Sequence, residues 1–416
     1  MRVALVLVIW YRFIEGAEMT ALQSPALLGG EPITKSADWP GWPPRLSGLN
    51  EALAKVVEQD RWGVHSDVVK EFEEQFSAYH DAQYGLAMAN GTLALSAILK
   101  ALGIGPGDEV ILPAYTFLTT ATAVMDVGAK PVFADISPRT FNLDPSEAEK
   151  LVNNRTKAII PVHVGGNPAD MSSFNGIAAR HNLHIIEDAA QAHGAGYGGQ
   201  KVGSLGKASF FSFQSSKNLT AGEGGIVLTN DQELYEQLHP IYNCGRALNG
   251  AWHQHISPGM NYRLSAFQAA VLLFQMKHLE EWAQLRESNG LYLEKLLNAI
   301  PGISCAQREP ETERNAYHLF IFTYNEEEFN GLSKARFIKA LQAEGLLATD
   351  GYQPLYQLPF MDYAGPPLPA TESVCRQGVW LRQSQLLAGR GMMDKIAVAF
   401  RRIQKFSRQL AKLAAV

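Results

Sequence analysis

Residues 209–229 read SFFSFQSSKNLTAGEGGIVLT, and one lysine, Lys217, stands between two apolar runs in this stretch. The runs Ser209–Phe213 and Ile226–Thr229 have the composition of buried strands, and the Gly-Glu-Gly-Gly segment between them predicts a sharp turn. Lysines usually lie on solvated surfaces, because burying an unpaired ammonium group is costly. A lysine in this position therefore indicates that the protein uses its amine.

Further strand-like segments precede this stretch, and segments with helical periodicity separate them. The strand-like segments are Tyr84–Met88, Glu109–Pro113, Lys130–Asp135, Ala158–Val162 and His184–Glu187. Helices between successive strands imply right-handed crossovers and a mostly parallel, doubly wound α/β sheet. Such sheets bind ligands at the carboxyl ends of their strands, so we expect a ligand site there.

The chain divides into three regions by composition. Residues 1–50 hold an N-terminal extension and a Pro/Trp-rich arm that contains WPGWPP at 39–44, residues 51–280 form the large domain, and residues 281–416 form a smaller α+β domain. We expect a long helix over 266–298 to lead into the small domain, and an amphipathic helix over 396–413 to end it. The small domain is expected to close over the ligand site.

Composition limits the classes of function. The 416 residues are 46% hydrophobic and 19% charged, with a net charge of −5, which is typical of a soluble globular protein and argues against binding to nucleic acid. Three dispersed cysteines, Cys244, Cys305 and Cys375, indicate a reducing, cytoplasmic compartment. The apolar run at 3–10 is too short to span a membrane and lacks a cleavage site. We expect Met19 to be the natural start, with residues 1–18 an upstream extension.

Two segments suit a phosphate group. Asn90-Gly91-Thr92 precedes a helical pattern, and a glycine and a hydroxyl at a helix start offer free N–H groups and a favourable dipole. Ser212 adds a hydroxyl at a strand end. Taken alone, the first segment is better explained as an ordinary helix cap.

Two more features suit a planar, nitrogen-containing ring. Asp188 follows the strand-like His184–Glu187, where a carboxylate can hold a ring nitrogen protonated. Phe117, in Tyr115-Thr116-Phe117, offers an aromatic face. A helix cap at Asp188 and a core role for the aromatics are comparable alternatives when each is taken alone. A desolvated lysine can form a Schiff base with an aldehyde, so Lys217 and these features together predict pyridoxal 5'-phosphate.

Several strings carry a family resemblance. They are NGT at 90–92, GIGPGDEVILPAYTF at 103–117, PVH at 161–163, EDAAQAHGA at 187–195, SFQSSKNLTAGEGG at 212–225 and GMNYR at 259–263. In this combination the chain, from about residue 27, resembles the DegT/DnrJ/StrS type of sugar aminotransferase, whose members are fold-type I pyridoxal phosphate enzymes.

This resemblance implies a role for each site residue. Lys217 is expected to form the Schiff base, Asp188 to pair with the pyridinium nitrogen, and Phe117 to stack on the ring. Gly91, Thr92 and Ser212 are expected at the phosphate and Gln191 near the ring hydroxyl. Asn261 is expected to reach the phosphate of a neighbouring subunit, so the active unit should be a homodimer.

Less specific sequence features indicate the class of substrate. Gln214, CGR at 244–246, RNAYH at 314–318 and VWL at 379–381 are similar to the branch that aminates cyclitols and to 3-amino-5-hydroxybenzoate synthase. We therefore expect an amino group to pass from L-glutamine or L-glutamate to a keto-cyclitol or keto-sugar. His163 and His318 could line the substrate pocket, although a core role is equally plausible for each.

Other functions stay open beside aminotransfer. A dehydrating reaction like that of 3-amino-5-hydroxybenzoate synthesis, amination of a nucleotide-linked keto-sugar, and a non-catalytic regulator or partner subunit are the alternatives. GAGYGG at 194–199 fits a dinucleotide-binding pattern, but the residues after it predict a hairpin rather than a helix. His239, His253 and His255 lack a carboxylate or cysteine at ligand spacing, so we expect no metal site.

Overall fold

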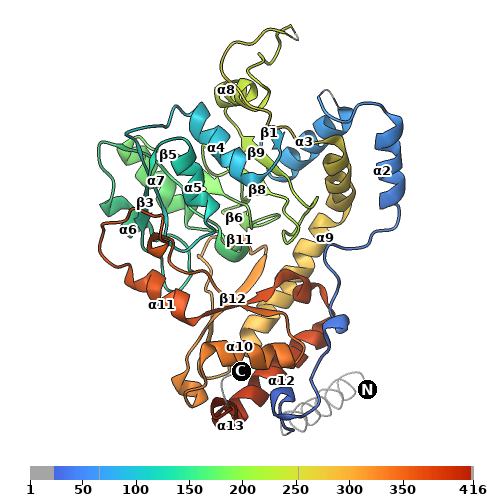
Figure 1. Cartoon of the computed structure of the whole chain (residues 1–416), viewed down its shortest axis with the longest axis vertical. Coiled ribbons are helices and arrows are strands. Elements are labelled where there is room, and N and C mark those ends of the chain that lie inside the picture. The colour runs from blue at the N-terminus through green and yellow to red at the C-terminus, as the bar shows by residue number, and fades with distance from the viewer. Residues whose placement is uncertain (1–22, 65, 252, 414–416) are drawn as a thin grey trace.

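The computed structural model describes residues 23–64, 66–251 and 253–413 (Figure 1). The expected start at Met19 and the expected extension 1–18 lie outside these residues. A seven-stranded sheet occupies the upper part of the molecule in the view of Figure 1. Its strands are β1 (Tyr84–Met88), β2 (Glu109–Pro113), β3 (Lys130–Ala134), β4 (Thr156–Ile159), β5 (His184–Asp188), β8 (Ala208–Ser212) and β9 (Gly225–Thr229).

The strand order is β1-β9-β8-β5-β4-β2-β3, and only β9 runs against its neighbours. The predicted mostly parallel α/β sheet is therefore confirmed. Three strands end earlier than expected: β3 at Ala134, β8 at Ser212, and β4 at Ile159, beyond which Val162 makes only an isolated bridge to Asp188. Every residue of β2 and β9 is buried, as expected for strands covered on both faces.

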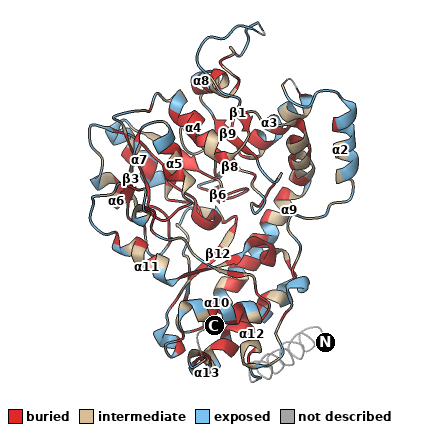
Figure 2. Cartoon of the chain, in the orientation of Figure 1, coloured by how far each residue is buried: buried red, intermediate tan, exposed pale blue. Residues whose placement is uncertain are grey.

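Helices cover both faces of this sheet. α3 (Asp67–Tyr79), α6 (Pro145–Lys150), α7 (Met171–His181) and α9 (Ala266–Leu297) pack in one apolar core with the sheet. α4 (Gly91–Ala101), α5 (Thr119–Asp126) and α8 (Gln232–Tyr242) pack in the other. α2 (Leu49–Glu58) packs through Val56 on the start of α9. Figure 2 shows the buried residues concentrated between these helices and the sheet.

A second, antiparallel sheet lies in the lower part of the molecule in Figure 1. Its order is β10 (Ile303–Cys305), β12 (Leu319–Tyr324), β14 (Gly378–Arg382) and β13 (Ala348–Asp350). Its core includes residues of α9, α10 (Lys334–Ala343) and α12 (Arg390–Lys405). The chain also forms the helices α11 (Pro369–Gln377) and α13 (Ser407–Ala411) and the short turns η3 (Val164–Gly166), η4 (Glu327–Phe329), η5 (Leu355–Gln357) and η6 (Gln383–Leu387).

The two predicted helices of the C-terminal third differ in outcome. α9 agrees with the predicted helix over 266–298 to within one residue. The predicted helix over 396–413 begins earlier, at Arg390, and breaks at Phe406 between α12 and α13. The predicted domain boundary at 280 falls inside α9, and the three-part division stays a prediction.

The Pro/Trp-rich arm lies against the second sheet and its helices. It contains the short turns η1 (Ala26–Leu28) and η2 (Ser36–Asp38), and its apolar side chains pack in the core of that sheet. The fully buried carboxylate of Glu344 accepts backbone N–H groups of Ala26 and Ile33 at 3.0 and 2.9 Å. Arg402 pairs with Glu344 at 3.0 Å and donates to the carbonyl of Glu31 at 2.7 Å. A buried ion pair thus fixes the arm.

The glycine-rich stretch at 194–199 forms the predicted hairpin. β6 (Gly196–Tyr197) pairs with β7 (Gln200–Lys201), and β11 (Thr312–Arg314) completes a three-stranded sheet. Gly198 and Gly199 turn the chain with φ of 59° and 82°, a backbone conformation that favours glycine. The stretch therefore has no helix that could hold a dinucleotide.

Candidate active site

Lys217 lies in the loop between β8 and β9, and its backbone is held on both sides. Its N–H donates to the carbonyl of Gln214 at 2.9 Å, and its carbonyl accepts the indole N–H of Trp42 at 3.0 Å. Burial lowers the pKa of the Lys217 amine to about 8, and the nearby Asp188 carboxylate partly opposes this shift. The amine is therefore easier to deprotonate than an ordinary lysine.

Asp188 ends β5 and is 4% exposed. Its Oδ2 accepts the hydroxyl of Thr120 at 2.8 Å, and its Oδ1 accepts the N–H of Ala190 at 3.2 Å. Burial raises the pKa of this carboxyl, while Thr120, Ala190 and the charge of Lys217 act in the opposite direction. A cationic ring nitrogen beside Asp188 would favour the ionised carboxylate in the same way that Lys217 does.

The helix start predicted for a phosphate group lies against a strand end. α4 begins at Gly91, and the side chain of Asn90 accepts the N–H of Leu93 at 2.9 Å as its cap. A Cβ on Gly91 would stand 3.1 Å from the Cβ of Ser212 and 3.4 Å from the carbonyl of Phe211. Gly91 thus allows the helix start and Ser212 to meet. The N-terminus of this 11-residue helix favours an anion.

Gln191 is fixed by two hydrogen bonds. Its Oε1 accepts the N–H of Gly165 at 2.8 Å, and its Nε2 donates to the hydroxyl of Tyr352 at 3.1 Å. The Tyr352 ring packs edge-on against Tyr115 and Trp380, with centroids 5.4 and 4.5 Å apart. Burial raises the pKa of Tyr352, so its hydroxyl stays protonated at neutral pH.

Sequence reasoning missed three residues of this neighbourhood. Thr120 is one of two adjacent threonines at the start of α5, and a hydroxyl so close to Phe117 was the available signal. Tyr352 lies 161 residues from Gln191 and Trp42 lies 175 residues from Lys217, and no local pattern links either pair.

The aromatic ring of Phe117 lies just before α5 and is 56% exposed. Its neighbour Tyr115 is instead fully buried, and its hydroxyl accepts the indole N–H of Trp380 at 3.1 Å. Of these two aromatics, Phe117 therefore has the surface that a planar ligand could use.

The two candidate substrate histidines have different surroundings. His163 is fully buried: its Nδ1 accepts the N–H of Ala169 at 3.0 Å, and its Nε2 stands 3.2 Å from the carboxylate of Glu187. Both ring nitrogens have partners, which favours the core role. His318 is 6% exposed, and its Nδ1 has no hydrogen-bond partner among the described residues. Burial and the charge of Lys217 lower its pKa, so His318 remains a neutral candidate near that lysine.

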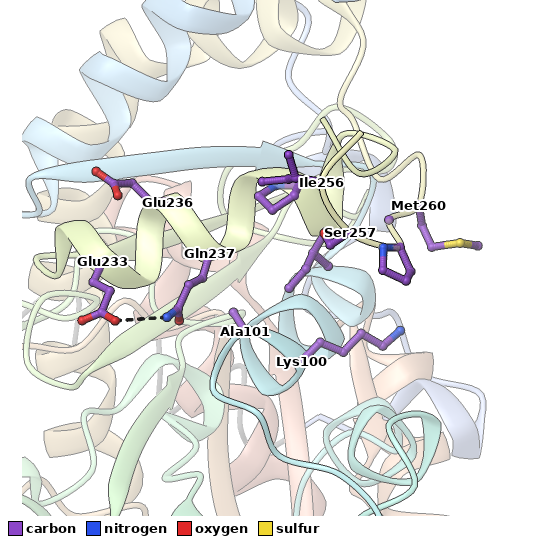
Figure 3. A pocket seen from close by; sticks show the side chains of 12 residues that line it. Lys100, Ala101, Glu233, Glu236, Gln237, Ile256, Ser257 and Met260 are labelled. Atoms are coloured by element: carbon purple, nitrogen blue, oxygen red, sulfur yellow. Dashed lines mark hydrogen bonds between the residues drawn. The ribbon is translucent and has the colours of Figure 1, made fainter. Parts of the chain in front are cut away.

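Asn261 lies in an exposed segment that pairs with the end of α8, and its neighbour Tyr262 accepts the N–H of Ala89, shortly before α4. Figure 3 shows the pocket beside it, which is lined by Lys100 and Ala101 of α4, by Glu233, Glu236 and Gln237 of α8, and by Ile256, Ser257 and Met260. The pocket has a volume of about 860 Å³, and no residue predicted to contact the cofactor lines it. Ile256 and Met260 are 59% and 58% exposed.

The described residues show no group of three His, Cys, Asp or Glu side chains placed to hold a metal ion. His255 instead contacts the carbonyl of Cys244 at 2.7 Å, and His239 contacts that of Arg246 at 3.3 Å. Across residues 23–64, 66–251 and 253–413, none of the helices has both the length and the hydrophobicity needed to cross a bilayer.

The donor set fits pyridoxal phosphate. An amine of lowered pKa faces a buried carboxylate, a helix start closed by glycine meets a serine hydroxyl, and an aromatic ring is exposed nearby. Together with the doubly wound sheet, this set defines a fold-type I pyridoxal phosphate enzyme. Residues 47–399 match the DegT/DnrJ/EryC1/StrS aminotransferase family, and the chain belongs to this family.

Characterised relatives extend over almost the whole chain. The 3-amino-5-hydroxybenzoate synthase of Amycolatopsis mediterranei is 35% identical over 371 residues, which cover 85% of this chain and 94% of that protein. The L-glutamine:2-deoxy-scyllo-inosose aminotransferase of Streptomyces lividus is 33% identical over 425 residues, covering 93% and 99%. A crystal structure of 3-amino-5-hydroxybenzoic acid synthase superposes with a TM-score of 0.81 at 34% identity and covers 87% of this chain and 98% of that one.

Proposed function

We propose that this aminotransferase moves an amino group from L-glutamine or L-glutamate to a keto-cyclitol of the inosose type or a related keto-sugar, as part of aminocyclitol or antibiotic biosynthesis. The observation that carries the proposal is the pair of the half-buried Lys217 and the buried Asp188, in which desolvation lowers the pKa of the lysine amine to about 8. The similarity to inosose aminotransferases supports the choice of substrate class.

Bound pyridoxal phosphate would supply an electron sink for the carbon that loses a proton. The chain's part is to hold and to move protons. The free amine of Lys217 would take the proton from the amino donor's α-carbon and deliver it to the exocyclic carbon of the cofactor, and a pKa near working pH suits this exchange. Asp188, oriented by Thr120, would keep the ring nitrogen protonated.

The remaining residues would bind and orient the cofactor. Gly91, Thr92 and Ser212 would hold the phosphate at the start of α4, Phe117 would cover one ring face, and Gln191 would face the ring hydroxyl. His318 would line the substrate side near Lys217. We assign no substrate contact to His163, because Glu187 and Ala169 occupy its ring nitrogens.

Replacement of Lys217 by alanine tests the assignment. We expect Lys217→Ala to lose both half-reactions, measured separately as conversion of the bound cofactor by L-glutamine and as amination of scyllo-inosose. Lys157→Ala, which removes an exposed lysine of β4, is the matched control and should retain wild-type rates. Turnover by Lys217→Ala at more than about one hundredth of the wild-type rate would exclude the lysine as proton carrier.

A dehydrating reaction is the second candidate, and the similarity to 3-amino-5-hydroxybenzoate synthase favours it. Both reactions need the same lysine and the same carboxylate. Product mass separates them, because net aminotransfer replaces a ketone oxygen by an amino group, whereas dehydration removes the elements of water. Nucleotide-linked keto-sugars belong in the same screen of acceptors.

We further propose that the enzyme is a cytoplasmic homodimer whose subunits share the active site. Asn261 lies in an exposed segment, and the nearby Ile256 and Met260 are exposed apolar residues that line the pocket of Figure 3. A second subunit would cover these side chains, and Asn261 would reach the phosphate group that is bound in that second subunit. Three free cysteines, with no disulfide, support the reducing compartment.

A further inference from the structure

The carbonyl of Lys217 accepts a hydrogen bond from a distant part of the chain. The donor is the indole N–H of Trp42, at 3.0 Å, from the Pro/Trp-rich arm. The lysine N–H is bound to Gln214, and the next residue, Asn218, donates from its side chain to the carbonyl of Ala316 at 2.7 Å. The peptide on either side of Lys217 is therefore held at three points, and only one of them comes from the lysine's own loop.

Trp42 is itself held by α9. The guanidinium of Arg286 lies 5.1 Å from the indole centroid, and Trp282 packs edge-on at 5.5 Å with an interplanar angle of 75°. Arg286 is fully buried and donates twice to the side chain of Gln383, at 2.9 and 2.6 Å. These contacts fix the plane of the indole and therefore the direction of its N–H.

The arm is also anchored on the side that precedes Trp42. The buried Trp39 donates its indole N–H to the carbonyl of Gly345 at 2.7 Å, and the pair of Glu344 and Arg402 holds the chain before it. In Figure 1 the arm, in blue, runs beside α9 from the lower sheet toward the upper one. It connects the core of the second sheet to the loop that carries Lys217.

We propose that Trp42 is a positioning residue: its N–H fixes the backbone of Lys217 and thereby the place of the lysine amine relative to Asp188. The inference rests on the proposed role of Lys217. A lysine stem has four flexible carbons, so the direction of its amine depends on how well its Cα is fixed. Errors of about 1 Å in a reacting group cost about a hundredfold in rate.

Replacement of Trp42 by phenylalanine tests the proposal, because the ring remains and the N–H is lost. Trp62→Phe is the matched control: its indole also donates to a carbonyl, that of Val56 at 2.9 Å, and it lies on the surface at 49% exposure. A second variant with 3-benzothienylalanine at residue 42 keeps the bicyclic ring and lacks only the N–H.

The first measurement uses the cofactor-free protein. Cyanate modifies neutral amines, and peptide mass spectrometry would follow its reaction with Lys217 as a function of pH. The loosened loop should admit water, so we expect both variants at residue 42 to raise the midpoint of this curve above that of the wild type. Trp62→Phe should leave the midpoint unchanged. The second measurement is the single-turnover rate of the cofactor-loaded enzyme with L-glutamine, which should fall about 5- to 50-fold in the variants at residue 42.

Two results would overturn the proposal. One is a benzothienylalanine variant with the same titration curve and the same rate as the wild type. The other is a loss of melting temperature in both variants at residue 42 with no change in either readout once they are folded, which would leave Trp42 a purely structural role. If the wild-type enzyme itself ignores L-glutamine and L-glutamate, the proposed function fails, and the titration of Lys217 still decides the role of Trp42.

Discussion

At the scale of single residues, Lys217 and Asp188 determine each other's protonation. Burial lowers the pKa of the lysine and raises that of the carboxyl, whereas their mutual attraction acts against both shifts. A bound cationic ring would therefore stabilise the ionised form of Asp188, because it supplies a second positive charge when the lysine amine becomes neutral. This coupling makes the pH dependence of Lys217 sensitive to the charge of Asp188.

Removal of the Asp188 charge should lower the pKa of Lys217 further. The carboxylate raises the pKa of the amine, so in Asp188→Asn the lysine should become neutral at a pH below about 8. Cyanate modification of Lys217 in the cofactor-free protein, followed against pH, measures the midpoint. Asp362→Asn, at an exposed position, is the control and should match the wild type. A midpoint in Asp188→Asn equal to or above that of the wild type would contradict the coupling.

The sequence placed Lys217, Asp188, Gly91 and Ser212 at one edge of the sheet because the ends of neighbouring strands meet there. The sequence alone could not show which of His163 and His318 is the better candidate for the substrate pocket. That choice depends on Glu187, which is buried in the core and contacts the His163 ring. Partners that arrive from distant segments, as Tyr352 and Trp42 do, follow from tertiary packing and leave no local pattern.

At the scale of elements, one buried ion pair joins α12, the end of α10 and the arm. Glu344 follows α10, and Arg402 lies in the last turn of α12; both side chains are almost completely buried. The carboxylate also accepts two N–H groups of the arm. Because desolvation of both charges has a high free-energy cost, the pair stabilises the structure only while both partners are present.

Replacement of Arg402 alone should therefore be strongly destabilising. We expect Arg402→Met to reduce the free energy of unfolding by about 3–5 kcal/mol, because Glu344 would stay buried without its cation. Urea denaturation of the whole protein measures this change in the free energy of unfolding. Arg401→Met, on the exposed side of the same helix, should change stability by less than about 0.5 kcal/mol.

The double variant Glu344→Gln/Arg402→Met provides the check on this explanation. Removing both charges should recover part of the loss, because no unpaired ion remains in the core. The two side chains would act independently if the losses in free energy of unfolding of Arg402→Met and Glu344→Gln simply added in the double variant, and this result would contradict the explanation.

The elements themselves were largely predictable because their hydrophobic patterns follow their burial. The central strands read as short apolar runs, since helices cover both faces of the sheet. The long helix α9 was equally predictable from its sequence. The break at Phe406 was not predictable, because the helical spacing of apolar residues continues across it and no glycine or proline stands there.

At the scale of the whole molecule, the proposed dimer explains why apolar side chains surround an exposed segment. Ile256 and Met260 project beside the pocket formed by α4 and α8 (Figure 3). An interface at this place would also account for the exposure of Asn261, whose expected target is the phosphate of the other subunit.

A charged pair at this surface should separate the subunits. We expect Ile256→Asp/Met260→Asp to sediment as a monomer and to lose activity, because buried like charges oppose association and Asn261 would lose its target. Analytical ultracentrifugation measures the mass. Val57→Asp, at an exposed apolar position of α2 outside the pocket, is the control. A wild type that sediments as a monomer, or a double variant that remains a dimer, would contradict this interface.

The hydrogen bond from Arg402 to the carbonyl of Glu31 joins positions 371 residues apart. During translation, the start of the arm cannot bind Arg402 until the last helices leave the ribosome. At ordinary rates of synthesis this takes roughly 20–70 s after residue 42 has emerged. The parallel sheet and the lysine loop have their complete sequence well before then. The nascent chain consequently passes through a stage in which the lysine loop and the α9 residues that hold Trp42 have been made, while the buried ion pair that anchors the start of the arm is still incomplete.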